Sequence, residues 1–296
     1  MQDDRKEPDV IGVIGLGRMG SGIAATLMRG GCRIVVRDLD PQRMAPLVEG
    51  GAVGAADVAE ICGTCDTVLL SLPSSAVTVD VIEHQLAPAV RAGTTVIDMG
   101  TTVIRETRRL HALLAERDVE LIDAPVSGGS TGAAQGELYV FAGGRKETVE
   151  TKWDLLRILG GGRLTYCGES GCGQIAKAVN QLAMGLVDAA YIEAVAFGVN
   201  AGVDAETLRE AVGGEGGFRR QFDAIAARIA SGDGDGNDVK YAEHAYFLDE
   251  AHRAKFPVPM LDALYAYMSR FPVTMRDNMD RPYPPLWSAL TGGAES

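Results

Sequence analysis

The sequence is short of cysteine. It has five cysteines in 296 residues, at positions 32, 62, 65, 167 and 172. An odd number argues against a structure held together by disulfides. Cys62 and Cys65 form a C-x-x-C pattern, but they lead into the apolar segment 67–72, so a buried strand is a better interpretation than a redox pair. We expect no bound metal.

Long hydrophobic runs are missing as well. No window reaches the ~18 consecutive apolar residues of a membrane-spanning helix. Residues 1–8 are polar and acidic, unlike the basic and then apolar layout of a signal peptide. We therefore expect no membrane partner and a cytoplasmic location.

Positive charge is scarce too. Lysine and arginine number 28 against 40 aspartate and glutamate residues, which gives a formal net charge of −12. Because no basic patch dominates, nucleic acid is not an expected partner. Hydrophobic residues make up an ordinary 46%, and a chain longer than about 250 residues favours two domains.

The first half of the sequence alternates between short apolar runs and helical patterns. Residues 10–14 predict a strand buried on both faces, residues 19–29 a helix and residues 33–37 a second strand. Further strands are predicted at 67–72, 94–98, 119–123 and 137–142, with a helix at 106–117. This order predicts a doubly wound α/β domain with a parallel sheet.

The pattern changes after about residue 165. Apolar positions at helical spacing predict a long helix over residues 174–201. Four more helical stretches follow without a convincing strand, at 205–212, 218–230, 239–255 and 260–270. We expect two domains, an α/β domain over 1–168 and an all-α domain over 169–296, joined by the long helix.

A glycine-rich turn joins the first predicted strand to the first predicted helix. It follows the pattern G-x-G-x-x-G, as Gly15-Leu16-Gly17-Arg18-Met19-Gly20. In this context Gly15 allows the tight turn, Gly17 lets the backbone approach a pyrophosphate, and Gly20 lets helix and strand pack closely. The N–H groups at the start of the helix then bind the phosphates. The segment predicts a Rossmann domain that binds a dinucleotide, in preference to a merely structural turn.

An acidic residue follows the second predicted strand. Asp38 lies 23 residues after Gly15, where a carboxylate accepts hydrogen bonds from the adenosine ribose and repels the 2′-phosphate of NADP. Arg37 argues for NADP, but neighbouring side chains on a strand point in different directions. We expect NAD as the cofactor in preference to NADP.

Four further motifs accompany the glycine-rich turn. They are Leu72-Pro73, Asp98-Met99-Gly100-Thr101-Thr102, Asp123-Ala124-Pro125-Val126-Ser127-Gly128-Gly129 and Gly171-Cys172-Gly173-Gln174-Ile175-Ala176-Lys177-Ala178-Val179-Asn180-Gln181. Together the five motifs resemble the β-hydroxyacid dehydrogenase family, which includes 3-hydroxyisobutyrate dehydrogenase, tartronate semialdehyde reductase and related succinic semialdehyde reductases. The resemblance covers most of residues 9–260. Gly100 and Ile104 depart from the family's usual serine and proline.

The resemblance implies an enzyme that transfers a hydride between NAD and a small 3-hydroxy acid, or its semialdehyde or keto form. It implies cofactor contacts from the glycine-rich turn, Asp38, Leu72, Pro73, Thr101 and Lys240. It implies substrate contacts from Ser127, Gly128, Gly129, Asn180 and Gln181. Lys177 is then the acid/base residue, and Asn180 and Ser127 are further candidate catalytic residues. Homo-oligomers, dimers or tetramers, are expected for this architecture.

The residue types suit that chemistry. Lys177 lies on a largely apolar helix, where burial would lower its pKa towards neutrality, although a side chain that reaches out to water is the alternative. Asn180 and Gln181 follow three and four residues later, on the same helix face. Ser127 and the two glycines after it offer a hydroxyl and backbone N–H groups to a carboxylate, although an ordinary turn has the same composition.

Two features depart from the family. The lysine that covers the nicotinamide in many relatives aligns with Ala242, so Lys240 or His244 would have to replace it, and a lone histidine is usually structural. The segment 276–287 is longer and more aromatic than the usual family end. It predicts a contact with a neighbouring subunit, a cap over the substrate pocket, or a proline-rich surface tail.

The same residues allow two other functions. Imine reductases share the expected architecture, but they usually replace the lysine at the position of Lys177. A non-catalytic NAD-binding protein would need neither Lys177 nor the Ser-Gly-Gly turn. The presence of Lys177 and of the Ser-Gly-Gly turn therefore favours the dehydrogenase over both alternatives.

Overall fold

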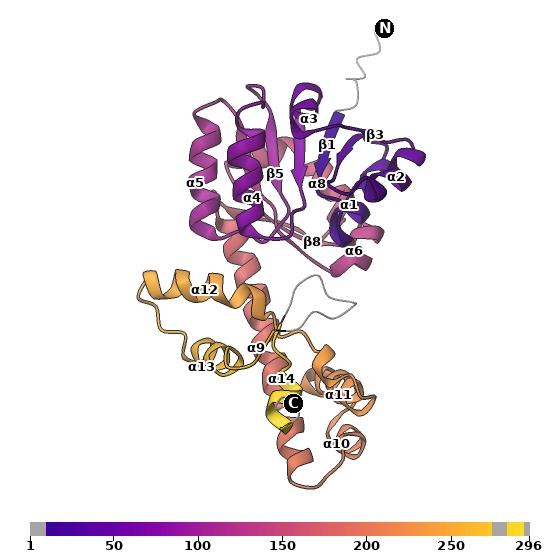
Figure 1. Cartoon of the computed structure of the whole chain (residues 1–296), viewed down its shortest axis with the longest axis vertical. Helices are drawn as coiled ribbons and strands as arrows, with labels where there is room; N and C mark the ends of the chain where they lie inside the picture. The colour runs from indigo at the N-terminus through magenta and orange to yellow at the C-terminus, as the bar shows by residue number, and fades with distance from the viewer. Residues whose placement is uncertain (1–9, 274–282, 293–296) are drawn as a thin grey trace. The chain divides into compact units, whose positions relative to one another are not determined.

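The computed structural model describes residues 10–273 and 283–292 of the chain. The chain divides into two compact units, Met1–Lys177 and Ala178–Ser296. Figure 1 labels most of the helices and several of the strands.

The first unit is built on one mixed, mostly parallel sheet. Its strands follow the order β3-β2-β1-β4-β5-β6-β8-β7, and β9 pairs with β8. Strands β1 to β6 pair in parallel, β8 is antiparallel to β6 and β7, and β9 is parallel to β8. The order 3-2-1-4-5-6 is that of a Rossmann domain, which confirms the predicted fold. The strands are β1 Val10–Ile14, β2 Arg33–Arg37, β3 Val53–Gly54, β4 Thr67–Leu70, β5 Thr95–Asp98, β6 Glu120–Asp123, β7 Val126–Ser127, β8 Tyr139–Gly143 and β9 Leu164–Gly168.

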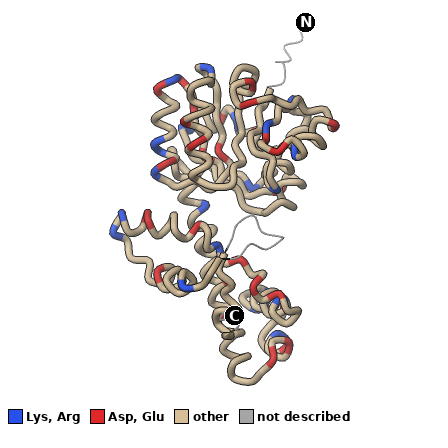
Figure 2. The backbone as a smooth tube through the Cα atoms, viewed as in Figure 1, with Lys and Arg blue, Asp and Glu red and all other residues tan. Residues whose placement is uncertain are grey.

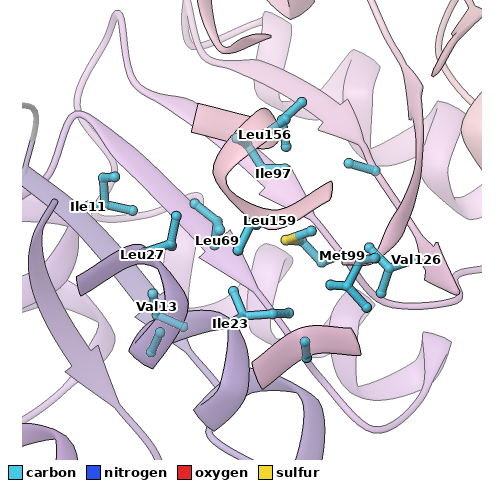
Figure 3. Close-up of a cluster of buried hydrophobic side chains, with 14 of the residues drawn as sticks. Ile11, Val13, Ile23, Leu27, Leu69, Ile97, Met99, Val126, Leu156 and Leu159 are labelled. Atoms are coloured by element: carbon cyan, nitrogen blue, oxygen red, sulfur yellow. The ribbon is translucent and has the colours of Figure 1, made fainter. Parts of the chain in front are cut away.

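Helices cover this sheet and bury its apolar side chains on both faces. Along β1, Val13 belongs to one hydrophobic cluster and Ile14 to the other, because successive side chains on a strand point to opposite faces. Figure 3 shows the first cluster, where Leu27 and Leu159 from two helices meet Leu69 of β4. The helices are α1 Arg18–Arg29, α2 Pro41–Glu49, α3 Val58–Thr64, α4 Ser75–Val81, the π-helix η1 Ile82–Leu86, α5 Ile104–Ala115, α6 Gly129–Gln135, α7 Lys146–Thr151 and α8 Trp153–Gly160.

The long helix α9, Cys172–Asn200, begins in the first unit and continues into the second. The described part of the second unit is otherwise formed by α10 Ala205–Val212, α11 Gly217–Ala230, the 3₁₀-helix η2 Gly234–Gly236, α12 Tyr241–Arg253, α13 Pro259–Met268 and α14 Leu286–Thr291. This confirms the expected helical region. By length and composition alone, α9 is long and apolar enough to cross a membrane, but core helices of soluble proteins meet the same criteria. Within the chain, 28% of its most apolar 18-residue window is buried.

The described part of the tail packs on its own unit. Trp287 covers Gly234, where an added Cβ would lie 2.5 Å from the indole ring. Asp235 accepts a hydrogen bond from the Ser288 backbone N–H at 2.9 Å, and the Tyr267 hydroxyl donates to the Ala289 carbonyl oxygen at 3.0 Å. Residues 276–282 of the predicted tail contact lie outside the described residues. In the described chain, basic and acidic residues are interspersed (Figure 2).

Candidate active site

The glycine-rich turn lies between β1 and α1, and two of its glycines are required by close contacts. Gly15 has φ +89°, and a Cβ there would lie 2.4 Å from the Ser71 carbonyl oxygen. A Cβ on Gly20 would lie 1.9 Å from the Gly15 carbonyl oxygen, so only glycine lets α1 pack on the turn. A Cβ added to Gly17 would lie 3.9 Å from Nη1 of Arg43 and would meet nothing closer among the described residues outside its own turn. Gly17 is the N-cap of α1 and provides no side-chain cap, so the helix start has room and N–H groups for a pyrophosphate.

Asp38 lies directly beside this turn. Its carboxylate accepts hydrogen bonds from the Leu16 backbone N–H at 2.6 Å and from the Asp40 backbone N–H at 2.9 Å. Arg37 donates to the backbone carbonyl of Asp38, and Arg43 lies 4.0 Å from its carboxylate. The structure therefore brings the predicted ribose-binding carboxylate to the predicted pyrophosphate site.

The predicted nicotinamide contacts follow β4 and β5, two neighbouring parallel strands. Leu72 is half-buried, Pro73 is exposed, and Thr101 is half-buried in the loop after β5. Asp98 holds this loop, because its carboxylate accepts from the Gly100 N–H at 2.9 Å and from the Thr102 hydroxyl at 2.6 Å. Burial raises the pKa of Asp98 to about 6 despite these hydrogen bonds.

The predicted substrate loop connects β7 to α6. Gly128 and Gly129 have φ values of +129° and +66°, which favour glycine over residues with a side chain. No atom lies within 4 Å of a Cβ added to Gly129, so the loop leaves space there. Ser127, half-buried, ends β7 immediately before these glycines.

Lys177 lies next to that loop. Its side chain is buried, with 7% exposed, and Nζ donates a hydrogen bond to the Val126 carbonyl oxygen at 2.7 Å. The alternative from the sequence, a Lys177 side chain that extends to solvent, is not observed. The fold thus brings the lysine of α9 to the residue that precedes Ser127, 51 positions earlier in the chain.

Asn180 and Gln181 follow Lys177 on α9, in the part of the helix that belongs to the second unit. Gln181 is buried, with 7% exposed, whereas Asn180 is half-buried and its Nδ2 contacts the Met184 sulfur at 3.6 Å. Helical spacing places them on the lysine's side of α9.

Lys240 and His244 both belong to the second unit. Lys240 has a left-handed backbone, φ +63°, and its Nζ forms an ion pair with Asp238 at 2.6 Å. His244 is completely buried, and burial lowers its pKa to about 4, so it is neutral at neutral pH. A neutral, enclosed imidazole fits the structural interpretation of His244 better than a contact with a cofactor.

The cysteine pair is unsuited to thiol chemistry. Cys62 and Cys65 are both completely buried, and burial raises each pKa to about 11. Nucleophilic cysteines need the thiolate, so these side chains act as small apolar core residues. Across residues 10–273 and 283–292, no group of three or more His, Cys, Asp or Glu side chains could hold a metal ion.

Sequence analysis did not assign a role to three buried groups at this site. Asp98, Asp123 and Gln174 are each at most 2% exposed and are linked by hydrogen bonds to the loop after β5 and to the start of α9. All three belong to the sequence motifs that carry the family resemblance. A polar residue at the end of a buried strand or at the start of a helix is the sequence signal that would have indicated them.

Comparison with known families matches both parts of the chain. Residues 10–168 match the NAD binding domain of 6-phosphogluconate dehydrogenase. Residues 171–280 match the NAD-binding family of NADP-dependent 3-hydroxyisobutyrate dehydrogenase.

Relatives of known name support the match. The chain is 33% identical to L-threonate dehydrogenase of Cupriavidus necator over 260 residues, which cover 86% of this chain and 88% of that protein. It is 34% identical to 3-hydroxyisobutyrate dehydrogenase of Pseudomonas aeruginosa over 202 residues, 68% and 67% of the two chains.

Solved structures agree with this assignment. The structure of a 3-hydroxyisobutyrate dehydrogenase from Salmonella typhimurium has a TM-score of 0.79 at 25% identity and covers 96% of this chain and 99% of that one. An imine reductase from Pseudomonas sp. shares the fold, with a TM-score of 0.61 at 21% identity over 96% and 99% of the chains. Two family models, similar relatives and the fold agree, and the chain belongs to the 3-hydroxyisobutyrate dehydrogenase, or β-hydroxyacid dehydrogenase, family of NAD(P)-dependent oxidoreductases that act on CH–OH groups.

Proposed function

We propose that the protein oxidises a small 3-hydroxy acid, or reduces the corresponding semialdehyde or keto acid, with Lys177 as the general acid/base. One observation carries this proposal. The buried Nζ of Lys177 is held 2.7 Å from the Val126 carbonyl oxygen, directly beside Ser127 and its glycines. A proton-exchanging group and a loop suited to a carboxylate therefore adjoin one another.

The reaction divides between the cofactor and the side chains. NAD, held by the glycine-rich turn and Asp38, would supply the acceptor for the hydride of the substrate's carbinol carbon. Lys177, in its neutral form, takes the hydroxyl proton as the carbonyl forms and returns it in the reverse direction. The hydroxyl of Ser127 and the N–H groups of Gly128 and Gly129 bind the acid group. Asn180, one turn further along α9, orients the substrate hydroxyl.

The cofactor is NAD rather than NADP in this proposal. A 2′-phosphate beside Asp38 would meet two carboxylates, those of Asp38 and Asp40, and Leu39 between them is apolar and 91% exposed. Arg43, the cation beside both carboxylates, already lies 3.6 Å from Asp40 and 4.0 Å from Asp38. Asp38→Asn should raise the ratio of kcat/KM for NADP to that for NAD at least ~10-fold, since one of the repelling charges is removed. An unchanged ratio would contradict this assignment.

Initial rates of NAD reduction test the main proposal. The substrates are 3-hydroxyisobutyrate, L-serine and L-threonate, named from relatives, and a cyclic imine with NADH tests the competing imine reductase function. Lys177→Ala should lower kcat on the best hydroxy acid by at least ~100-fold. Lys146→Ala, which removes an exposed lysine of α7, is the control. Near-normal turnover by the Lys177 variant would disprove the role of this lysine.

A second copy of this chain is the proposed cover for α9. The helix is apolar, yet only 28% of its most apolar window is buried within the chain, and Val179 and Phe197 are 63% and 78% exposed. Exposed apolar surface of this kind marks an interface. Phe197→Glu should lower the molar mass measured by light scattering, whereas Val53→Glu, at an exposed apolar residue of the first unit, should not. A wild-type monomer would contradict the proposal.

A further inference from the structure

Asp123 ends β6 with a carboxylate that the proposed chemistry does not use. It is completely buried, Oδ1 accepts from the Gly171 N–H at 2.9 Å, and Oδ2 accepts from the Gln174 N–H at 3.0 Å. Helix α9 begins at Cys172, and the N–H groups of a first turn have no partner within their helix. Asp123 therefore acts as an N-cap supplied by a strand 48 residues earlier, and its charge suits the positive end of the helix dipole.

Two glycines let the helix start and the sheet close around this carboxylate. A Cβ on Gly143 of β8 would lie 2.7 Å from Oδ1 of Asp123. A Cβ on Gly173 of α9 would lie 2.8 Å from Oδ2 and 2.3 Å from the Phe141 carbonyl oxygen. The close approach leaves the first turn of α9 no freedom to slide along the end of β6.

Gln174 extends the same contact to the loop after β5. Its Oε1 accepts from the Thr102 N–H at 3.1 Å, and its Nε2 donates to the Gly100 carbonyl oxygen at 3.0 Å. These two backbone groups flank Thr101, the expected cofactor contact. Asp98 holds the same two residues through the Gly100 N–H and the Thr102 hydroxyl. The loop is therefore fixed from the strand and from the helix.

We propose that Asp123 and Gln174 are positioning residues, which fix Lys177 relative to the loop that carries Thr101. Lys177 follows Gln174 by three residues, so a displaced first turn would also displace Nζ from the Val126 carbonyl oxygen. Misplacement of a reacting group by about 1 Å costs on the order of 100-fold in rate. The inference rests on the proposed acid/base role of Lys177.

Gln174→Leu tests this directly, because it removes both side-chain hydrogen bonds but keeps the backbone N–H that Asp123 accepts from. We expect kcat to fall at least ~10-fold. The Kd for NADH, from fluorescence titration, should change less than ~2-fold, because Asp98 still holds the loop that carries Thr101. In the reducing direction, the primary isotope effect with NADH deuterated at C4 should rise, since hydride transfer becomes slower than other steps. Tyr166→Phe is the matched control. It also removes a side-chain hydrogen bond to a backbone carbonyl of the first unit, the one from the Tyr166 hydroxyl to the Gly144 carbonyl oxygen at 3.1 Å.

Gln174→Glu adds a readout that a purely structural role would not give. A protonated carboxyl has the acceptor and donor of the amide, whereas the ionised form repels the Gly100 carbonyl oxygen. The titratable and charged groups on the elements around the start of α9 include Asp98 of β5, Arg108 of α5, Asp123 of β6, Cys167 of β9, and Cys172 and Lys177 of α9. The activity of the variant, relative to wild type at each pH, should rise as the pH falls from 8 to 6.

The outcomes separate the two proposals. If Lys177→Ala is inactive but Gln174→Leu keeps the wild-type kcat and isotope effect, the positioning inference is wrong. If Lys177→Ala keeps its turnover, the proposed function is wrong instead. If Gln174→Leu fails to fold, the glutamate variant decides, and a pH-independent activity ratio overturns the inference.

Discussion

The two compact units each bury titratable side chains, but they differ in how these are satisfied. In the first unit the carboxylates of Asp98 and Asp123 stand at paired positions of β5 and β6, and both accept hydrogen bonds from backbone N–H groups. In the second unit His244 is completely buried, and neither ring nitrogen makes a well-formed hydrogen bond to the described residues. Hydrogen bonds therefore hold the buried carboxylates of the first unit, whereas, among the described residues, packing alone surrounds the buried imidazole of the second.

This difference gives the units opposite responses to pH. Burial disfavours the charged form, so it raises the pKa of both carboxyls from 3.8 to about 6 and lowers that of His244 from 6.5 to about 4. Folding then binds protons at Asp98 and Asp123, and their contribution to stability is lost as the pH rises from 3.8 through 6. Folding releases a proton at His244, so stability there is lost as the pH falls from 6.5 through 4.

The largest expected effect comes from removing the imidazole. His244→Leu should abolish the local loss of stability on acidification, which for the wild type reaches on the order of 3 kcal/mol by pH 4. Hydrogen exchange measured on peptides of α12 at pH 7 and pH 4.5, corrected for intrinsic rates, detects the change. His252→Gln is the matched control, because His252 lies on the same helix but its side chain is 59% exposed. Equal acid sensitivity in wild type and His244→Leu would show that burial of His244 does not make the second unit acid-sensitive.

Asp98→Asn tests the expected pH response of the first unit, and its effect should be smaller. The amide copies the protonated carboxyl, so the variant should gain stability relative to wild type as the pH rises from 4 to 7, by on the order of 2 kcal/mol. The readout is exchange of the β5 and β6 amides. Asp80→Asn, at an exposed carboxylate of α4, should show no such trend. A pH-independent difference at Asp98 would mean that its carboxyl titrates normally in the folded protein.

The sequence predicted the elements that bury a long apolar run or need glycine. The turn at Gly15, the helix α9 and the strands β1, β2, β4, β5, β6 and β8 all carry such local signals, and the structure has them. Among the strands, it missed β9, Leu164–Gly168, and the two-residue strands β3, Val53–Gly54, and β7, Val126–Ser127. Most residues of β9 are half-exposed and both residues of β3 are exposed, so neither gives the apolar run that a buried strand does.

The candidate site was predictable where its signals are local in sequence. The glycine-rich turn and Lys177 were predicted from motif and helix pattern; in the structure Asp38 lies beside the turn and Val126 lies beside Lys177, while their roles stay predictions. The links from Gln174 to Gly100 and Thr102 span 74 and 72 residues and depend on the register that pairs Asp98 with Asp123. No local pattern encodes such a contact. The left-handed backbone of Lys240 is likewise a property of the folded chain.

The smallest expected effect separates burial from charge within the first unit. The Thr67 hydroxyl on β4 is completely buried without a hydrogen-bond partner in the described residues, whereas the Thr26 hydroxyl on α1 donates to the Ala133 carbonyl oxygen at 2.7 Å. Thr67→Val keeps the shape and removes an unsatisfied group, so it should stabilise the protein by about 0.5–1 kcal/mol at every pH. Thr26→Val removes this hydrogen bond and the one that the hydroxyl accepts from Arg29, and it should destabilise the protein by about 1 kcal/mol. Urea unfolding of both variants at pH 5 and pH 8 measures the pair. If Thr67→Val destabilises the protein, the Thr67 hydroxyl has a hydrogen-bond partner in the folded state, unlike the ring nitrogens of His244, which have none in the described part of the chain.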